Sequence, residues 1–391
     1  MKKEGSAVIL DLSSTGYATA KCLSGNDIDI LGIHTTKYSP IAQNSSFVNN
    51  SIISINDSYE MTLEFLLENA KHLESPATIF VASDPMVEFI AKFGNELKPY
   101  YHVPDSDKYD LEKIMSKKEM GLVAEKAGLK VPQNAILVKG DSTDKIIENA
   151  VFPAFVKPEN SLEGYKDMMG IADNKDELKK LINEKIKYCS HLLIAEYVPG
   201  LVTDLFETQG FVLSDGTPYT PVVIQKIRQH PDMLVGSGTF LETVYNPELE
   251  RLSNAFLKEL SLNGPVDIDF KRSSINGDYY FIEANYRISG NVDVSRAAGS
   301  NVPLLFHQSK NGQLSMLPKA KYGVQWVDEG RDWKHVVEGT VSEAELFNSY
   351  KNICAFAYFD SRDRNVFNSQ FKDINHPFFK RFKKELNLDG E

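Results

Sequence analysis

Two short strands joined by a turn give this sequence its strongest structural signal. Residues 266–270 and 279–287 are apolar and aromatic, and the run 273–278 between them is rich in turn-forming residues. This pattern predicts an antiparallel hairpin whose strands lie side by side. Because side chains alternate along a strand, the hairpin also decides which polar groups share a face.

Polar side chains on this predicted hairpin can meet at one place. Glu283 and Asn285 are two residues apart and leave the same face of their strand, and Asp269 on the partner strand comes close to both. Two carboxylates and an amide form an all-oxygen site suited to Mg²⁺, and Arg287 beside them suits a phosphate. The alternative is an edge hairpin whose polar face is only solvated.

The composition is that of an ordinary globular protein, and it argues against some partners. The chain has 391 residues, of which 42% are hydrophobic, enough for two or three domains. A formal net charge of -11 argues against a nucleic-acid binder and against an anionic membrane surface as partner. No apolar run reaches the roughly 18 to 20 residues of a membrane span. The three cysteines lie far apart and form no metal-ligand spacing, so we expect a reduced, cytoplasmic protein.

The N-terminal part alternates between strand and helix patterns. Residues 7–12 and 28–33 have the pattern of buried strands, with a helical run between them, which predicts a parallel sheet and a ligand crevice at its carboxyl edge. The loop 13–16 can receive a phosphate or carboxylate at the helix N-terminus. It has one glycine where a dinucleotide fingerprint needs three, so NAD binding is disfavoured. We place the end of this first domain near Asp110.

Two lysines in the next segment are candidates for phosphate binding. Lys117 lies early in a helical pattern over 111–127, where the helix dipole does not favour a cation. Lys157 ends the apolar strand 152–158, directly before a polar, glycine-containing loop, and a cation at such a place suits a phosphate. Both lysines can equally be solvated side chains.

Two further features precede the hairpin. The apolar strand 191–198 runs into a Pro-Gly break, whose free backbone groups can hydrogen-bond a purine edge. Residues 225–230 form a cationic patch in an acidic protein, and Lys226 and Arg228 are expected to share one strand face. A guanidinium there suits a carboxylate, although a solvated strand end gives the same pattern.

The order of these features resembles the ATP-grasp ligase superfamily over about residues 5 to 310. The motifs that carry the resemblance are, in chain order, AGLKVP, FPAFVKP, AEYVPG, DIDF and FIEANYR. QKIRQHP followed by GSGTFLET is most similar to the carboxylate–amine ligase group that includes D-aspartate ligase. Two departures stand out. The loop 161–166 has fewer small residues than the usual phosphate-covering flap, and Tyr286 stands where the family has proline.

The resemblance implies a fold and a set of residue roles. The fold is α/β with α+β lobes, an ATP-grasp fold behind an N-terminal Rossmann-like domain. Its expected parts are a pre-ATP-grasp domain at 1–110, a small lobe with its linker helix at 111–200, a large lobe with the metal site at 201–310, and a C-terminal extension at 311–391. The implied ATP contacts are Lys117 and Lys157 at the phosphates, Glu196, Tyr197 and Val198 at the adenine, and Asp204 at the ribose. The implied metal ligands are Asp269, Glu283 and Asn285, and the implied substrate or phosphate contacts are Arg287, Arg228 and Lys226.

The implied chemistry is ATP-dependent activation of a carboxylate as an acyl phosphate, followed by attack of an amine. ATP and Mg²⁺ (or Mn²⁺) are the expected cofactors, and a carboxylic acid and an amine such as an amino acid are the expected partners, with a homodimer left open. Three alternatives remain: a ligase joining an amino acid to a uronic-acid or cell-envelope precursor, a bicarbonate-activating carboxylase, and a non-catalytic nucleotide-binding regulatory protein.

Overall fold

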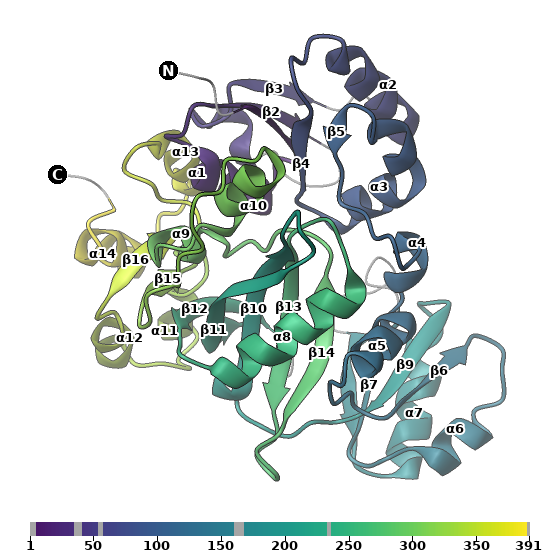
Figure 1. Cartoon of the computed structure of the whole chain (residues 1–391). Coiled ribbons are helices and arrows are strands. Elements are labelled where there is room, and N and C mark those ends of the chain that lie inside the picture. The colour runs from purple at the N-terminus through teal and green to yellow at the C-terminus, as the bar shows by residue number, and fades with distance from the viewer. Residues whose placement is uncertain (1–4, 35–40, 54–57, 160–167, 233–235, 389–391) are drawn as a thin grey trace.

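A parallel sheet forms the N-terminal part of the structure. The computed structural model describes residues 5–34, 41–53, 58–159, 168–232 and 236–388, and Figure 1 shows their arrangement. The sheet order is β3-β2-β1-β4-β5, with every pair parallel. Its strands are β1 (Gly5–Leu10), β2 (Ile28–His34), β3 (Asn50–Ile53), β4 (Ala77–Val81) and β5 (Tyr101–His102). With them are α1 (Ser14–Leu23), the 3₁₀ turn η1 (Ile41–Asn44), α2 (Tyr59–Ala70) and α3 (Asp84–Leu97). Strand β4 is buried throughout, as expected where both faces of a parallel sheet are covered.

A four-stranded antiparallel sheet forms a separate small lobe. Its order is β6-β9-β7-β8. Its strands are β6 (Asn134–Val138), β7 (Ala154–Pro158), β8 (Gly170–Ala172) and β9 (His191–Glu196). The linker helices α4 (Leu111–Ile114) and α5 (Lys117–Lys126) lead into it, and α6 (Asp144–Asn149) and α7 (Lys175–Lys185) pack on it. The lobe has a hydrophobic core of its own, whose buried members all lie between Leu137 and Ile194.

The third sheet is the largest and carries most of the site. Its order is β14-β13-β10-β11-β12-β15-β16, antiparallel except for the last pair. Its strands are β10 (Leu205–Val212), β11 (Pro218–His230), β12 (Ser237–Thr243), β13 (Val266–Arg272), β14 (Tyr279–Asn285), β15 (Gln325–Val327) and β16 (Ile353–Phe356), with η3 (Val202–Asp204) before β10. Helix α8 (Pro247–Leu260) covers one face (Figure 1), capped at its start by the side chain of Asn246. The hairpin predicted from the sequence is confirmed as β13 and β14.

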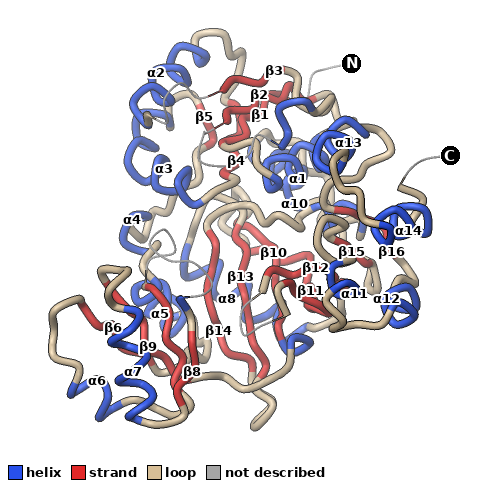
Figure 2. The backbone as a smooth tube through the Cα atoms, turned by 180° about the vertical axis from the view of Figure 1, so that it is seen from behind, coloured by secondary structure: helices blue, strands red, loops and turns tan. Residues whose placement is uncertain are grey.

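The C-terminal extension continues the large sheet. Strands β15 and β16 add to its edge beyond β12, and Figure 2 shows them from behind with the last helices packed around them. The helices after β14 are α9 (Asp293–Ala297), α10 (Val302–Lys310), α11 (Lys334–Val337), α12 (Glu343–Ser349), α13 (Arg364–Phe371) and α14 (Pro377–Glu385). An aromatic core that includes Phe240, Trp333, Phe379 and Phe382 joins helices α11 through α14 to the sheet. Among the helices in the described ranges, none is both long and apolar enough to cross a membrane.

Candidate active site

A cavity of about 620 Å³ lies on the face of the large sheet opposite α8. Its wall includes strands β7 and β9 of the small lobe, the first residues of α1, and the segment that follows β15. The volume is in the range of pockets that bind small molecules and cofactors. Residues from all three sheets or their connections therefore meet around one space.

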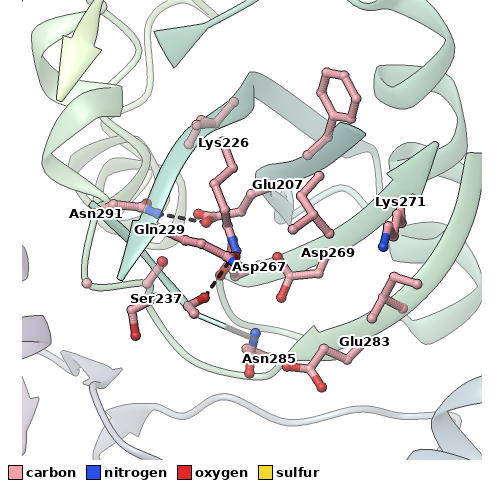
Figure 3. A pocket seen from close by; sticks show the side chains of 18 of the residues that line it. Glu207, Lys226, Gln229, Ser237, Asp267, Asp269, Lys271, Glu283, Asn285 and Asn291 are labelled. Atoms are coloured by element: carbon pink, nitrogen blue, oxygen red, sulfur yellow. Dashed lines mark hydrogen bonds between the residues drawn. The ribbon is translucent and has the colours of Figure 1, made fainter. Parts of the chain in front are cut away.

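The hairpin brings the predicted metal ligands together in this cavity. Asp269 pairs with Glu283, and Asp267 pairs with Asn285, in the β13–β14 register. Asp269, Glu283 and Asn285 all line the cavity, and Figure 3 shows their side chains gathered at its floor. Burial, together with the nearby carboxylates of Glu283 and Glu207, raises the pKa of Asp269 to about 7.

Both candidate phosphate lysines also line the cavity, beside Glu283. Lys157 ends β7 and is 8% exposed, and its Nζ lies 3.5 Å from Glu283 Oε2. Lys117 donates from Nζ to the carbonyl of Glu159 at 2.8 Å. Burial alone would raise the pKa of Glu283, but the charges of Lys157 and then Lys117 outweigh it and lower that pKa. Glu283 is thus held as a carboxylate between two ammonium groups.

The end of β9 forms an apolar slot. Glu196, Tyr197 and Val198 line the cavity together with Phe155 and Leu193. Aliphatic and aromatic walls with nearby backbone groups suit a planar base. All three predicted hinge residues therefore lie where a base could bind.

Two of the remaining basic candidates also reach the cavity. Arg287 lines it and donates from Nε to Asp84 Oδ1 at 2.7 Å, so this arginine ties the start of α3 to the large sheet. Burial alone would lower the pKa of Arg287, but the negative charge of Asp84 outweighs the effect of burial, and the pKa is raised. Lys226 on β11 also lines the cavity, with its Nζ 3.4 Å from the carbonyl of Gly236.

Arg228 does not line the cavity, which corrects the expectation that it shares a face with Lys226. The pairing of β11 with β12 shifts between these two residues, so the strand bulges and its side chains change face. Arg228 instead donates to both carboxylate oxygens of Asp332 and lies over the ring of Phe240 at 4.3 Å. A register shift of this kind cannot be recognised from the alternation of residues along the sequence of one strand.

Asp204 lies outside the cavity wall and is held by hydrogen bonds of its own. Its carboxylate accepts from Arg272 Nη2 at 2.8 Å and from the backbone N–H of Leu201 at 2.9 Å, and the residue is not part of the cavity wall. These contacts hold the turn into β10, and the predicted ribose contact of Asp204 stays a prediction. The predicted flap at 161–166 lies outside the described residues.

Sequence reasoning missed several cavity residues, among them three charged residues near Asp269. Asp267 and Lys271 flank Asp269 at two-residue spacing, so the alternation of β13 was a sufficient signal for both. Glu207 faces Asp269 from β10, a pairing between distant segments that the sequence does not display. Asp267 Oδ1 is buried without a hydrogen-bond partner, and burial followed by Glu207 raises the pKa of Asp267 well above its ordinary range.

Comparison with known proteins places this geometry in a known fold. A family model described as "ATP-grasp in the biosynthetic pathway with Ter operon" matches residues 220–329. A solved N5-carboxyaminoimidazole ribonucleotide synthetase in complex with ADP superposes with a TM-score of 0.65 at 14% identity, covering 87% of each chain. The chain has the ATP-grasp fold. The L-amino acid ligase of Bacillus licheniformis is a further ATP-grasp neighbour, with a TM-score of 0.57, 13% identity and coverage of 82% of this chain and 76% of that one.

A relative found by sequence matches most of the chain. The D-aspartate ligase of Enterococcus faecium (strain Aus0004) is 22% identical over 371 residues, which cover 88% of each chain. The similarity therefore extends well beyond any one of the three sheets.

The side chains at this end of the cavity suit a divalent cation, because they offer carboxylate and amide oxygens. Within the described ranges, Asp269 and Asn285 have no side-chain hydrogen bond, so their oxygens are open to a ligand. No group of three or more His, Cys, Asp or Glu among those residues is arranged to hold a metal ion alone. The amide of Asn285 and the oxygens of a nucleotide are then needed to complete the coordination.

Proposed function

We propose that this protein is an ATP-dependent carboxylate–amine ligase that releases ADP and phosphate. The observation that carries the proposal is the convergence of Asp269, Glu283 and Asn285 with the two lysines, Lys117 and Lys157, beside an apolar slot. Opposite charges side by side suit a nucleotide phosphate chain with its metal ion. The relative that matches over 88% of the chain is a D-aspartate ligase, which favours an amino acid as the acid and places aspartate first in a substrate screen.

The proposed reaction has two steps. A carboxylate oxygen of the acid bonds to the terminal phosphorus of ATP, and the bond from that phosphorus to its bridging oxygen breaks, releasing ADP. The amine nitrogen then bonds to the acyl carbon, the bond from that carbon to the phosphate oxygen breaks, and the nitrogen loses a proton. No enzyme nucleophile is required.

Each group of residues has a task in this reaction. Asp269, Glu283 and Asn285 would hold Mg²⁺, which supplies positive charge to the phosphoryl oxygens when bound. Lys117 and Lys157 bind the phosphates, and the slot at Glu196–Val198 holds the base. Arg287 stabilises negative charge on the transferred phosphoryl group or on the acyl substrate. Lys226 lies further along the sheet, where it can attract an anionic acid.

Release of ADP tests the proposal. We expect continued ADP release, beyond the first turnover, only when an acid and an amine are both present, because the acid alone gives ADP and an acyl phosphate that awaits the amine. The measurement is coupled ADP detection against pools of amino acids, of carboxylated cell-envelope precursors and of amines. D-aspartate and L-aspartate are the first acids. Absence of substrate-dependent ADP release across all pools, with nucleotide still bound, would favour a non-catalytic nucleotide-binding protein.

A bicarbonate-activating carboxylase is the second candidate. It is favoured by the superposition on N5-carboxyaminoimidazole ribonucleotide synthetase over 87% of each chain. The two candidates differ in their acid. ADP release that depends on bicarbonate and persists without any organic acid would select the carboxylase.

We predict that the affinity for Mg²⁺ rises with pH. Asp269 has a pKa of about 7 because it is buried near other carboxylates, so a proton competes with the metal below that pH. Affinity should therefore increase between about pH 6 and about pH 8, by up to about tenfold. Calorimetric titration with Mg²⁺ alone measures it, since a nucleotide would add its own titration. Asp269→Asn is the control: it should bind Mg²⁺ more weakly and without this pH dependence, and an unchanged slope would assign the proton to another group.

A further inference from the structure

The cavity continues well beyond the phosphate-binding groups, along the large sheet. Glu283 lies on β14, whereas the cavity also includes Trp326 on β15 and residues just after it. Four strands separate β14 from β15 in the sheet order. Neighbouring strands are about 4.8 Å apart, so the two ends of the cavity are separated by several strand widths. A nucleotide bound at the β14 end therefore leaves the β15 end for other molecules.

A rigid turn from the C-terminal extension forms part of the wall at the β15 end. Its first residue, Asp328, is bonded through its N–H to the carbonyl of Thr239 on β12 at 2.8 Å, and its last, Asp332, donates from its N–H to the carbonyl of Asp328 at 2.9 Å. Inside the turn, Glu329 accepts hydrogen bonds from the backbone N–H groups of Ala357 and Tyr358 at 2.9 and 2.8 Å. The backbone of residues 328–332 is thus fixed from both sides.

Arg228 holds the same turn through the side chain of its last residue, Asp332. Its Nε lies 3.1 Å and its Nη2 2.5 Å from the two carboxylate oxygens of Asp332, which is fully buried. The hydroxyl of Thr239 donates to the same carboxylate at 2.6 Å, and the Tyr350 hydroxyl also contacts it. A bidentate pair with a buried carboxylate defines both distance and orientation.

Asp328 and Arg331 of this fixed turn both line the cavity, and Arg331 is the basic side chain of the two. It lines the cavity and its side chain is 45% exposed. Its contact with Asp328 is made through Nε at 3.5 Å, and no side-chain hydrogen bond of its two Nη groups is present in the described ranges. Lys226 on β11 also places a positive charge on the cavity wall. A guanidinium with two free donor groups, held on a fixed backbone, is suited to a carboxylate or phosphate.

We propose that the β15 end of the cavity is a substrate subsite in which Arg331 binds an anionic group of the acid or the amine, and that Arg228 is a positioning residue for it. This inference rests on the proposed ligase function. The anionic group is one that does not react, because the carboxylate to be activated must lie at the phosphates beside Glu283. The acid and the amine are both candidate sources of that anionic group, and a guanidinium would bind it in the same way on either substrate.

The test is the Michaelis constant of each substrate for Arg331→Ala, using the acid and amine found by ADP release. We expect the KM of one of the two, the acid or the amine, to rise about tenfold to a hundredfold, as expected for loss of a charged hydrogen bond, with the KM of ATP unchanged. Whichever KM rises identifies the source of the anionic group. Arg362→Ala is the control: the Arg362 side chain is 43% exposed, pairs with an aspartate close in sequence, Asp360, and does not line the cavity.

Arg228→Lys tests the positioning role. It keeps the charge but loses the bidentate pair with Asp332, so the same KM should rise, and the double variant with Arg331→Ala should be no worse than Arg331→Ala alone. A lower melting temperature without a change in that KM would make Arg228 purely structural.

The possible failures are distinct. An Arg331→Ala enzyme with unchanged KM for both substrates overturns the subsite while leaving the ligase function intact. Accepted substrates that carry no non-reacting anionic group also overturn it. A wild-type protein that releases no ADP with any pool removes the proposed function, and the inference with it.

Discussion

Glu283→Gln is expected to reduce ADP formation by about 10²–10³-fold, the typical effect of removing one group that stabilises transition-state charge. The substitution keeps the size of the side chain but removes the charge that lies 3.5 Å from Lys157 and faces Asp269 across the hairpin. Without it, a metal ion loses one of its two anionic ligands at the step where charge builds on the phosphoryl group. The measurement is steady-state ADP release with saturating ATP, together with circular dichroism to verify the fold.

The control for that experiment is Glu184→Gln. Glu184 is a solvent-exposed residue of α7, its side chain is 58% exposed, and it does not line the cavity, so its variant should match the wild type. Near-normal ADP formation by Glu283→Gln would remove Glu283 from the metal site and weaken the ligase proposal as a whole.

Lys157→Ala is expected to raise the dissociation constant for ATP about tenfold to a hundredfold and to leave that for adenosine nearly unchanged. Lys157 contacts Glu283 at the phosphate side of the cavity, whereas the apolar slot for the base is built from other residues. Adenosine has no phosphates for this ammonium group to bind, so removing the ammonium group should not change its affinity. Calorimetry with both ligands measures the difference.

Lys185→Ala provides the matched comparison for Lys157→Ala. Lys185 belongs to the same lobe, its side chain is 14% exposed, and it lies outside the cavity. Equal weakening of ATP and adenosine binding by Lys157→Ala would mean that the lysine supports the lobe's structure and does not bind phosphate.

The part of the site that could be predicted from the sequence is the part built by neighbours in the chain. Asp269, Glu283 and Asn285 lie on two strands joined by one turn, so strand alternation alone brings them together. The positions of the two lysines were harder to predict, because Lys117 and Lys157 reach Glu283 only through packing of the small lobe on the large sheet. There the order of motifs along the chain, and not any single motif, supplied the prediction.

The failures have equally local causes. Arg228 was assigned to the wrong face because β11 bulges next to it, and the bulge depends on the pairing with β12. Arg331, which takes the place that Arg228 was expected to have, follows a strand of three residues in a segment with no recognisable pattern. Its position comes from Asp332, Glu329 and their distant partners, and such contacts cannot be read from a single sequence.

The separate core of the small lobe has a consequence for how the site can work. Since every buried member of that core lies between Leu137 and Ile194, we expect the lobe to move as a unit relative to the large sheet. Lys157 travels with the lobe, whereas Asp269, Glu283 and Arg331 belong to the other body. A nucleotide bound between the small lobe and the large sheet would contact both. Part of its binding energy is then available to exclude water from the phosphoryl group, while the subsite at Arg331 keeps its shape whether the lobe is open or closed.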